Sequence, residues 1–371
     1  MICDNMIYRK TDVKKYHMFN LNEIIRENIR QITPYSSARD EFSGNASVFL
    51  DANENSFGSP FTKWYNRYPD PHQLKVKEKL SSIKGLPADQ IFLGNGSDEC
   101  IDLLYRAFCE PKIDNVIICP PTYGMYEVSA SINDIQVKKV NLTSAFQLDL
   151  NSVENAIDDH TKMIFICSPN NPTGNSLDPQ DIEALLNNYF GLVVIDEAYI
   201  NFSRYHSFIK QLSEYPNLVV LQTLSKAWGL AGLRIGMACA DSGIVSILDS
   251  IKPPYNISQS SQDIALEALD NTDQVNQMIL DIVEQRKMLA DALESGKLVE
   301  KVFSSDTNFL LVKIKNPTKC YQFLLSKGIV VRDRSNVTLC EGCLRITIGT
   351  QKENNALCDA LLEFSKFSIQ A

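Results

Sequence analysis

The sequence lacks the paired ligand spacing of a structural metal site. It has four histidines, and Cys340 and Cys343 form one C-x-x-C motif without a second pair of ligands. Because a structural zinc site usually takes its four ligands from closely spaced pairs, we expect no metal centre. The other cysteines stand singly, several inside apolar runs, which is typical of a protein kept reduced in the cytoplasm.

Long apolar and long basic stretches are also missing. No apolar run approaches the roughly 18 residues that cross a membrane, and the N-terminus lacks the apolar core of a secretion signal. The formal net charge is −9, and no basic run offsets it. We therefore expect small-molecule ligands, no nucleic acid and no membrane partner. Met18 offers an alternative start, which would make residues 1–17 a dispensable leader.

What the sequence does contain is the alternation of a parallel α/β sheet. Its short β-branched runs do not alternate apolar with polar residues, which predicts strands covered on both faces. The predicted strands are residues 115–119, 163–167, 192–196 and 217–221, with helices at 123–133 and 177–189. Asp178 is the expected N-cap of the second helix, followed by Pro179 in its first turn. The predicted fold class is α/β with a doubly wound, mostly parallel sheet.

A second, smaller unit is expected after the Pro-rich stretch 250–258. An amphipathic helix over roughly 260–295 leads into predicted strands at 307–314, 328–334 and 343–349. The chain has 371 residues, more than a usual domain of about 100–200. We expect an N-terminal leader and arm (1–50), a large α/β domain (51–262) and a small C-terminal α+β domain (263–371).

Unusual polar residues follow the predicted strands, where ligands bind in such sheets. Gly96 and Ser97 open a helical pattern, and the free N–H groups of a helix start can hold an anion, although an ordinary turn has the same pattern. Asn171 lies in "SPNNPTGN", directly after the strand 163–167. Asp196 ends a buried strand, where a carboxylate needs a partner, and helix capping is its alternative role.

Lys226 adds an amine to this set, in "TLSKAWGLAGLRIG". An amine can form a Schiff base with an aldehyde, a buried carboxylate can keep a pyridine nitrogen protonated, and an anion site with an arginine can hold a phosphate. Those are the needs of pyridoxal 5′-phosphate. A lone lysine is usually a solvated surface residue, but Asp196, Asn171 and Arg234 accompany this one.

Three motifs in this order, "SPNNPTG", "DEAY" and "SKAWGLAGLRIG", resemble those of the fold type I pyridoxal-phosphate enzymes, specifically the histidinol-phosphate aminotransferases. The resemblance continues through "NIRQITPY", "DANENSFG", "NRYPDP", "PPTYGMY", "GIVVRDR" and "GCLRITIG", also in family order. Only the first 20 or so residues fall outside it.

The resemblance implies a role for each matching residue. Lys226 bonds to the cofactor and then moves protons as general acid and base, while Asp196 pairs with the pyridine nitrogen. Asn171 and Tyr199 bind the phenolic oxygen of the ring, and Tyr123 stacks on its face. The implied contacts to the cofactor phosphate come from Gly96, Ser97, Thr223, Ser225, Arg234 and, from a neighbouring subunit, Tyr68. The site is then shared across a homodimer.

Two arginines are expected at the substrate. Arg332 and Arg345 end β-like runs, and a hairpin would bring them to one edge of the small unit. In the family the arginine of "LRITIG", here Arg345, binds a carboxylate, and Arg332 and Tyr35 can join it on a phosphate, with Asn171 beside them. The alternative is a pair of surface arginines in ion pairs, with Asp333 adjacent to Arg332.

The implied activity is amino transfer between L-histidinol phosphate and 2-oxoglutarate, giving imidazole acetol phosphate and L-glutamate, in histidine biosynthesis. A threonine-phosphate decarboxylase and a broad aromatic-amino-acid aminotransferase share the cofactor residues and are the alternatives. A pyridoxal-phosphate-sensing transcription regulator would need a DNA-binding module, and the stretch before "DANEN" is too short and too weakly charged for one.

Overall fold

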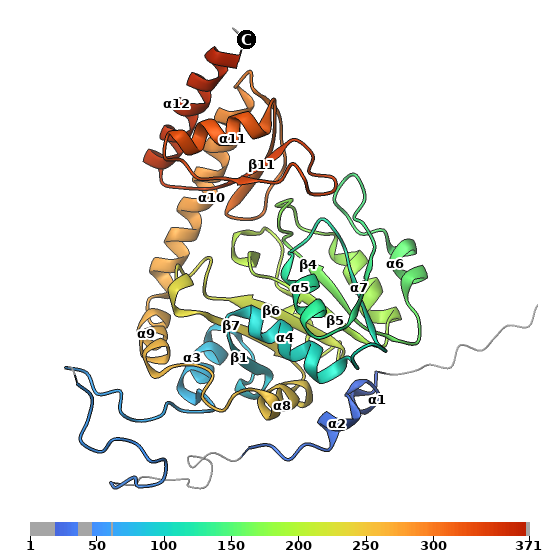
Figure 1. The fold of residues 1–371 in the computed structure, drawn as a ribbon, viewed down its shortest axis with the longest axis vertical. Helices are drawn as coiled ribbons and strands as arrows, with labels where there is room; N and C mark the ends of the chain where they lie inside the picture. Colours follow the sequence, from blue (N-terminus) through green and yellow to red (C-terminus); the bar gives the residue numbers. More distant parts are fainter. Residues whose placement is uncertain (1–18, 36–46, 61, 369–371) are drawn as a thin grey trace, which may run out of the picture.

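A computed structural model describes residues 19–35, 47–60 and 62–368 (Figure 1). The predicted leader, Met18 and part of the predicted arm lie outside these residues. The described helices are α1 (Leu21–Ile24), α2 (Glu27–Arg30), α3 (Leu74–Lys84), α4 (Ser97–Phe108), α5 (Met125–Ile132), α6 (Leu150–Ala156), α7 (Pro179–Asn188), α8 (Ser242–Ile251), α9 (Gln259–Leu269), α10 (Thr272–Glu294), α11 (Pro317–Ser326) and α12 (Gln351–Ser368). The strands are β1 (Ile91–Asn95), β2 (Asn115–Ile118), β3 (Gln136–Lys139), β4 (Thr161–Cys167), β5 (Leu192–Asp196), β6 (Leu218–Thr223), β7 (Ile235–Ala240), β8 (Val299–Val302), β9 (Phe309–Ile314), β10 (Arg332–Asp333) and β11 (Cys343–Thr347).

The large sheet has seven strands in the order β1-β7-β6-β5-β4-β2-β3. The four strands predicted from sequence, β2, β4, β5 and β6, form its parallel centre. β7 runs antiparallel to both of its neighbours, β1 and β6. The predicted fold class is therefore confirmed, with one antiparallel strand inserted near an edge. The predicted N-cap is confirmed too, since Asp178 accepts a hydrogen bond from the backbone of Gln180.

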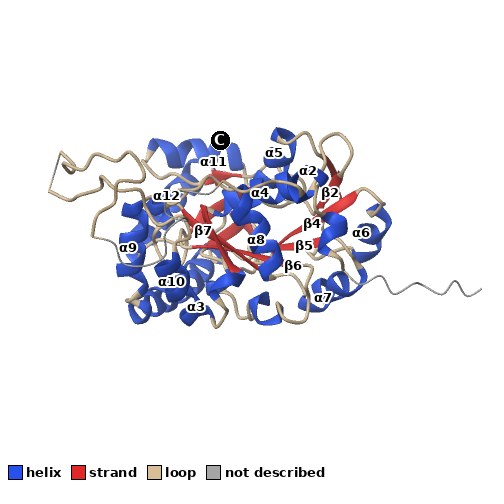
Figure 2. Ribbon diagram, turned by 90° about the horizontal axis from the view of Figure 1, so that it is seen from below, coloured by secondary structure: helices blue, strands red, loops and turns tan. Residues whose placement is uncertain are grey.

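Helices cover both faces of this sheet, which explains why its central strands are apolar throughout (Figure 2). One face packs against α4, α5 and α8. The other face packs against α3, α6, α7 and α9. With both faces buried, polar side chains are left to the strand ends.

The small sheet is antiparallel, in the order β10-β11-β9-β8, and packs against α10, α11 and α12 (Figure 1). Two expectations for this region are wrong. The single helix predicted over 260–295 is divided into α9 and α10, because Asn271 leaves the helical conformation and its amide donates to the carbonyl of Glu267 at the end of α9. The strand predicted over 328–334 contains only Arg332–Asp333, because Gly328 and Ile329 instead close the C-terminus of α11.

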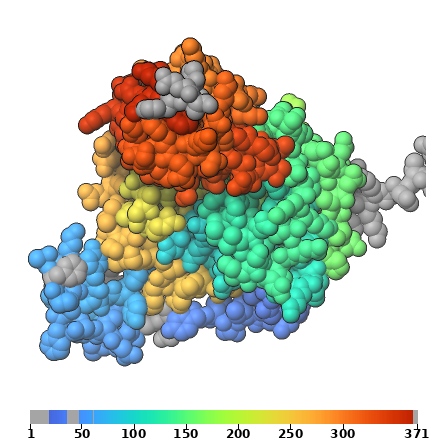
Figure 3. Space-filling model, turned by 45° about the horizontal axis from the view of Figure 1, so that its top comes forward, coloured from blue at the N-terminus to red at the C-terminus, as the bar shows by residue number. Residues whose placement is uncertain are grey.

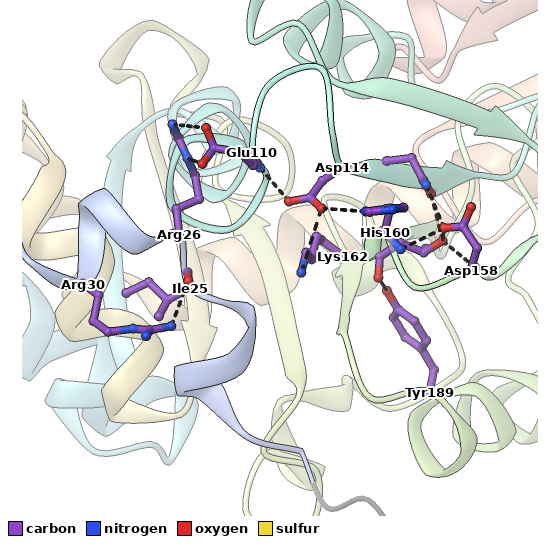
Figure 4. A network of polar contacts seen from close by, with 11 residues as sticks. Ile25, Arg26, Arg30, Glu110, Asp114, Asp158, His160, Lys162 and Tyr189 are labelled. Carbon is purple, nitrogen blue, oxygen red and sulfur yellow. Dashed lines mark hydrogen bonds and ion pairs between the residues drawn. The ribbon is translucent and has the colours of Figure 1, made fainter.

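The amino ends of the parallel strands carry a polar network that attaches the N-terminal helices (Figure 4). Arg26 donates to a carboxylate oxygen of Glu110 at 3.0 Å, and the backbone N–H of Glu110 donates to Asp114 at 2.7 Å. Asp114 is buried and also lies 3.8 Å from His160 and 3.9 Å from Lys162. These contacts occupy one end of the sheet and leave the carboxyl ends of the strands to the site described next.

Candidate active site

A cavity of about 660 Å³ opens at the carboxyl ends of the parallel strands. The loops after β2, β4, β5 and β6 contribute to it, as do the N-terminus of α4 and the small sheet. Most of the residues predicted for the site line this cavity: Ser97, Tyr123, Asn171, Asp196, Tyr199, Thr223, Ser225, Lys226, Arg234, Arg332 and Arg345. The topology therefore gathers side chains that lie far apart in the sequence.

Asp196 is the last residue of β5 and is buried at the floor of the cavity. Its Oδ2 accepts a 2.7 Å hydrogen bond from the Tyr126 hydroxyl, and its Oδ1 accepts the backbone N–H of Ala198 at 3.0 Å. Burial raises the pKa of Asp196, and the Tyr126 and Ala198 bonds partly oppose that rise. Asp196 therefore caps only the local turn at Ala198, and its carboxylate still faces the cavity. A cationic ring nitrogen would offset its burial.

Tyr126 is a contact that sequence reasoning missed. It lies on α5, fully buried, three residues after Tyr123. Residues three apart share a helix face, so the spacing of the two tyrosines in "TYGMY" was the available signal. The rings of Tyr123 and Tyr126 meet edge to face at 5.6 Å. Tyr123, just before α5, therefore supplies a ring to the cavity wall, and Tyr126, in its first turn, supplies a hydroxyl to Asp196.

Lys226 lies in the loop after β6, with Nζ 5.6 Å from the centre of the Tyr199 ring. Its side chain is exposed because it faces the open cavity, yet the surrounding protein still restricts its hydration. Burial is the largest cause of its lowered pKa, Arg345 and Arg234 lower it further, and Asp196 opposes them. A larger fraction of the amine is therefore neutral near pH 7 than for a surface lysine.

An anion cradle forms where β1 meets α4. Gly96 is the N-cap of α4 with φ +77°, and no side chain caps the helix. A Cβ at Gly96 would lie 2.5 Å from Nη2 of Arg234, so only glycine lets this guanidinium approach. The hydroxyl of Thr223 donates to Ser225 at 2.9 Å, and Arg234 reaches the same serine at 3.4 Å. Free helix N–H groups, two hydroxyls and a guanidinium suit a phosphate.

Asp98 is a second residue that sequence reasoning did not assign. It accepts a 3.0 Å hydrogen bond from the Tyr123 hydroxyl and lies 3.6 Å from Arg234. Burial and Asp98 together raise the pKa of Tyr123. Asp98 thus fixes the ring that forms one wall of the cavity and the arginine at the cradle.

Three arginines of the small sheet close the other side of the cavity. Arg332 and Arg345 are directly paired across β10 and β11, as the expected hairpin requires. Arg345 donates to the side-chain oxygen of Asn171 at 2.5 Å and lies over the Phe309 ring at 5.2 Å. Among the described residues no carboxylate lies within ion-pair distance of Arg332, so the surface-pair alternative is not what the structure has. The third arginine, Arg334, was not predicted.

Two predicted site residues lie away from the cavity. Tyr68 is half exposed and stacks on Tyr255 with ring centres 4.5 Å apart. Tyr35 is 72% exposed, in the segment that follows α2. A single chain therefore does not bring either hydroxyl to the site. In the part of the chain that the structure describes, no helix is long and apolar enough to cross a membrane, and no cluster of side chains is suited to a metal ion.

Known proteins share both the sequence and the fold. The family model for aminotransferase class I and II matches residues 61–361. A histidinol-phosphate aminotransferase from Parabacteroides distasonis is 53% identical over 344 residues, covering 93% of this chain and 99% of that protein. The crystal structure of the Clostridium acetobutylicum histidinol-phosphate aminotransferase matches with a TM-score of 0.75 at 26% identity, covering 82% of this chain and 92% of that one. The Sinorhizobium meliloti enzyme, solved with pyridoxal 5′-phosphate, matches with a TM-score of 0.74 at 23% identity over 85% of this chain and 90% of that one.

Proposed function

The chain belongs to the class I and II aminotransferase family, and we propose that it is a histidinol-phosphate aminotransferase that uses pyridoxal 5′-phosphate. The reaction moves the amino group of L-histidinol phosphate to 2-oxoglutarate, giving imidazole acetol phosphate and L-glutamate. It is a step of histidine biosynthesis. The observation that carries the proposal is one cavity lined by an amine, a buried carboxylate, an anion cradle and three arginines.

The residues present suit this cofactor. The anion cradle at Gly96 matches its phosphate, because a side chain at Gly96 would fill the space that Arg234 needs. Asp196 suits a protonated pyridine nitrogen, since its carboxylate is buried and makes no ion pair with the described residues. Lys226 suits the aldehyde, because its pKa is lowered. When bound, the cofactor supplies an electrophilic carbon for the amines and a ring that accepts the electron pair of a broken C–H bond.

The side chains of this chain then divide the work. Lys226, an amine with a lowered pKa, would act as the general base that takes the proton from the substrate carbon and as the general acid that returns it to the carbon on the other side of the amino nitrogen. Asp196 stays ionised against the ring nitrogen, and Tyr126 holds its carboxylate in place. Tyr123 and Tyr199 bound the ring site, and Arg345 positions Asn171 beside it.

The arginines support a doubly anionic substrate. Glutamate and 2-oxoglutarate each carry two carboxylates, and histidinol phosphate carries a phosphate in place of an α-carboxylate. Arg332 and Arg345, paired across two strands, offer forked donors to either group. The relatives at about half identity over nearly the whole chain point to the phosphorylated substrate.

A homodimer in the cytoplasm completes the proposal. The segment before α3 stands apart from the body of the molecule (Figure 3). It exposes large apolar side chains to solvent, which is unfavourable in a monomer and typical of an interface: Val48, Leu50, Phe57, Trp64 and Tyr68. A second copy would cover this surface and bring Tyr68 to the cofactor phosphate of its neighbour.

Half-reaction kinetics test the substrate. The purified holoenzyme is mixed in turn with histidinol phosphate, threonine phosphate, histidine and phenylalanine, and conversion of the cofactor to pyridoxamine phosphate is followed by absorbance. Histidinol phosphate should react with the highest kcat/KM. Faster reaction of phenylalanine would favour the aromatic aminotransferase, and carbon dioxide release from threonine phosphate would favour the decarboxylase.

A further inference from the structure

Arg334 is the one arginine of the cavity wall without an assigned role. It follows β10 directly, and its backbone N–H donates to the carbonyl of Cys343 at 2.9 Å. That bond extends the ladder in which Arg332 pairs with Arg345. Because side chains alternate along a strand, residues 332 and 334 point to the same face, together with their partners at 345 and 343.

This face of the small sheet is the one turned toward the cavity. Leu344 and Asp333 pair on the opposite face, and Leu344 is buried in the core of the small domain. Arg332, Arg334 and Arg345 all line the cavity instead. The register therefore presents three guanidinium groups side by side to one bound molecule.

Arg334 makes no ion pair with the residues that the structure describes. Its Nε is buried and donates to no acceptor among the described residues. Burial lowers its pKa, and the neighbouring charge of Arg332 lowers it further. The side chain as a whole is only partly buried, but a buried N–H without an acceptor is costly unless a ligand satisfies it.

We propose that Arg334 is a specificity-determining residue that binds the phosphate of a phosphorylated amine substrate, beside Arg332 and Arg345. This inference rests on the proposed function and adds a third guanidinium to the site for the substrate phosphate. A carboxylate has two oxygens and one charge, and a forked guanidinium such as Arg345 can satisfy it. A phosphate monoester has three acceptor oxygens and a charge near −2 above its second pKa of about 6. Where the phosphate takes the place of an α-carboxylate, the third guanidinium is therefore needed by the phosphate and not by the α-carboxylate of glutamate.

The test compares Arg334→Gln with wild-type holoenzyme in single half-reactions. The substrates are histidinol phosphate, histidinol without the phosphate, and glutamate. KM for histidinol phosphate should rise roughly 10- to 150-fold, the worth of one charge-assisted hydrogen bond, while histidinol and glutamate change little. Lys313→Gln is the matched control, since Lys313 pairs with Cys343 on the same face but does not line the cavity. It should leave all three substrates unchanged.

Two further readouts separate binding from structural damage. In wild type, KM for histidinol phosphate should rise below about pH 6 as the phosphate gains a proton, and this dependence should be weaker in Arg334→Gln. Inorganic phosphate should compete with glutamate, with an inhibition constant that rises in the variant. This second readout does not require histidinol phosphate to be a substrate, so it stands apart from the proposed function. Equal losses for histidinol and histidinol phosphate, or unchanged phosphate inhibition, would overturn the role of Arg334.

Discussion

The hydroxyl of Tyr126 donates a 2.7 Å hydrogen bond to Oδ2 of Asp196, and both side chains are buried. Tyr126 is packed between the Phe165 ring, 5.0 Å away, and the Tyr123 ring. The bond opposes the rise that burial causes in the pKa of Asp196. The aromatic layer of α5 and β4 therefore helps to keep a carboxylate charged at the floor of the cavity.

Tyr126→Phe should reduce turnover without unfolding the protein. Removing the hydroxyl raises the pKa of Asp196, so the carboxylate competes more strongly for the proton of the ring nitrogen and the ring loses positive charge. A hydrogen bond to a charged group is worth about 1.5–3 kcal/mol, so kcat should fall by roughly 10- to 150-fold. Tyr189→Phe is the control, because the hydroxyl of buried Tyr189 donates to the backbone carbonyl of Thr161 and does not line the cavity. Equal kcat in the two variants would show that the Asp196 bond has no catalytic effect.

Gly96→Ala should weaken cofactor binding. The added Cβ would meet Arg234 at 2.5 Å, and alanine is strained at φ +77°. Gly85 also has a positive φ, +69°, but has open space around it. Both variants should lose on the order of 1 kcal/mol of stability from backbone strain, whereas only Gly96→Ala should release the cofactor on dialysis. Equal retention of cofactor by the two variants would count against the cradle.

Glu197 should make stability fall as pH rises. It is buried, accepts hydrogen bonds from Phe208 and Gln222, and burial raises its pKa from 4.5 to about 7. Between about pH 4.5 and pH 7 the folded protein therefore holds a proton on Glu197 that the unfolded chain has lost. The stabilisation that this proton gives is complete below about pH 4.5 and is lost as the pH rises through about 7.

The comparison is wild type against Glu197→Gln, both free of cofactor, in urea unfolding between pH 5 and 8. The free energy of unfolding of wild type, relative to the variant, should fall by roughly 2–3 kcal/mol over this interval. Most of that change should occur below pH 7. A constant or rising difference would mean that Glu197 stays ionised throughout.

A shared active site predicts recovery of activity on mixing. Tyr68 lies outside the cavity of its own chain, so Tyr68→Ala and Lys226→Ala should damage different halves of a composite site. Each variant alone should be nearly inactive. A mixed dimer carries one site with both residues intact and should regain up to about half of the wild-type activity per dimer, as expected for one working site in two. If mixed dimers form, as mass spectrometry can establish, and stay inactive, Tyr68 does not act across the interface.

The sequence predicted the centre of the fold better than its edges. The runs that became β2, β4, β5 and β6 are apolar along their whole length, which is a strong local signal. β7, "IGMACA", is made largely of small residues and lies beside the lysine motif, so it was not predicted. The break at Asn271 is set by one residue within a pattern that stays amphipathic, and β10 is only two residues long.

In the site, too, the sequence predicted the residues with a strong local signal and missed those defined by packing. Lys226, Asp196 and Asn171 stand in motifs that can be recognised locally. Tyr126 and Asp98 act through partners 70 and 25 residues away along the chain, so only the packed structure reveals their bonds. The register of β10 on β11 is what places Arg334 on the same face as Arg332 and Arg345, and it is not evident from the sequence. Tyr35 and Tyr68 stay predictions, because their proposed partner is a second chain.

Transfer of labelled nitrogen gives the most direct measurement of the proposed reaction. Holoenzyme is incubated with ¹⁵N-amino histidinol phosphate and unlabelled 2-oxoglutarate, and the products are identified by mass spectrometry. We predict ¹⁵N-glutamate and imidazole acetol phosphate in equal amounts from wild type. Lys226→Ala should retain the cofactor but yield neither product. Label that remains in histidinol phosphate, or that appears as ammonia without glutamate, would contradict the assignment of this chain as a histidinol-phosphate aminotransferase.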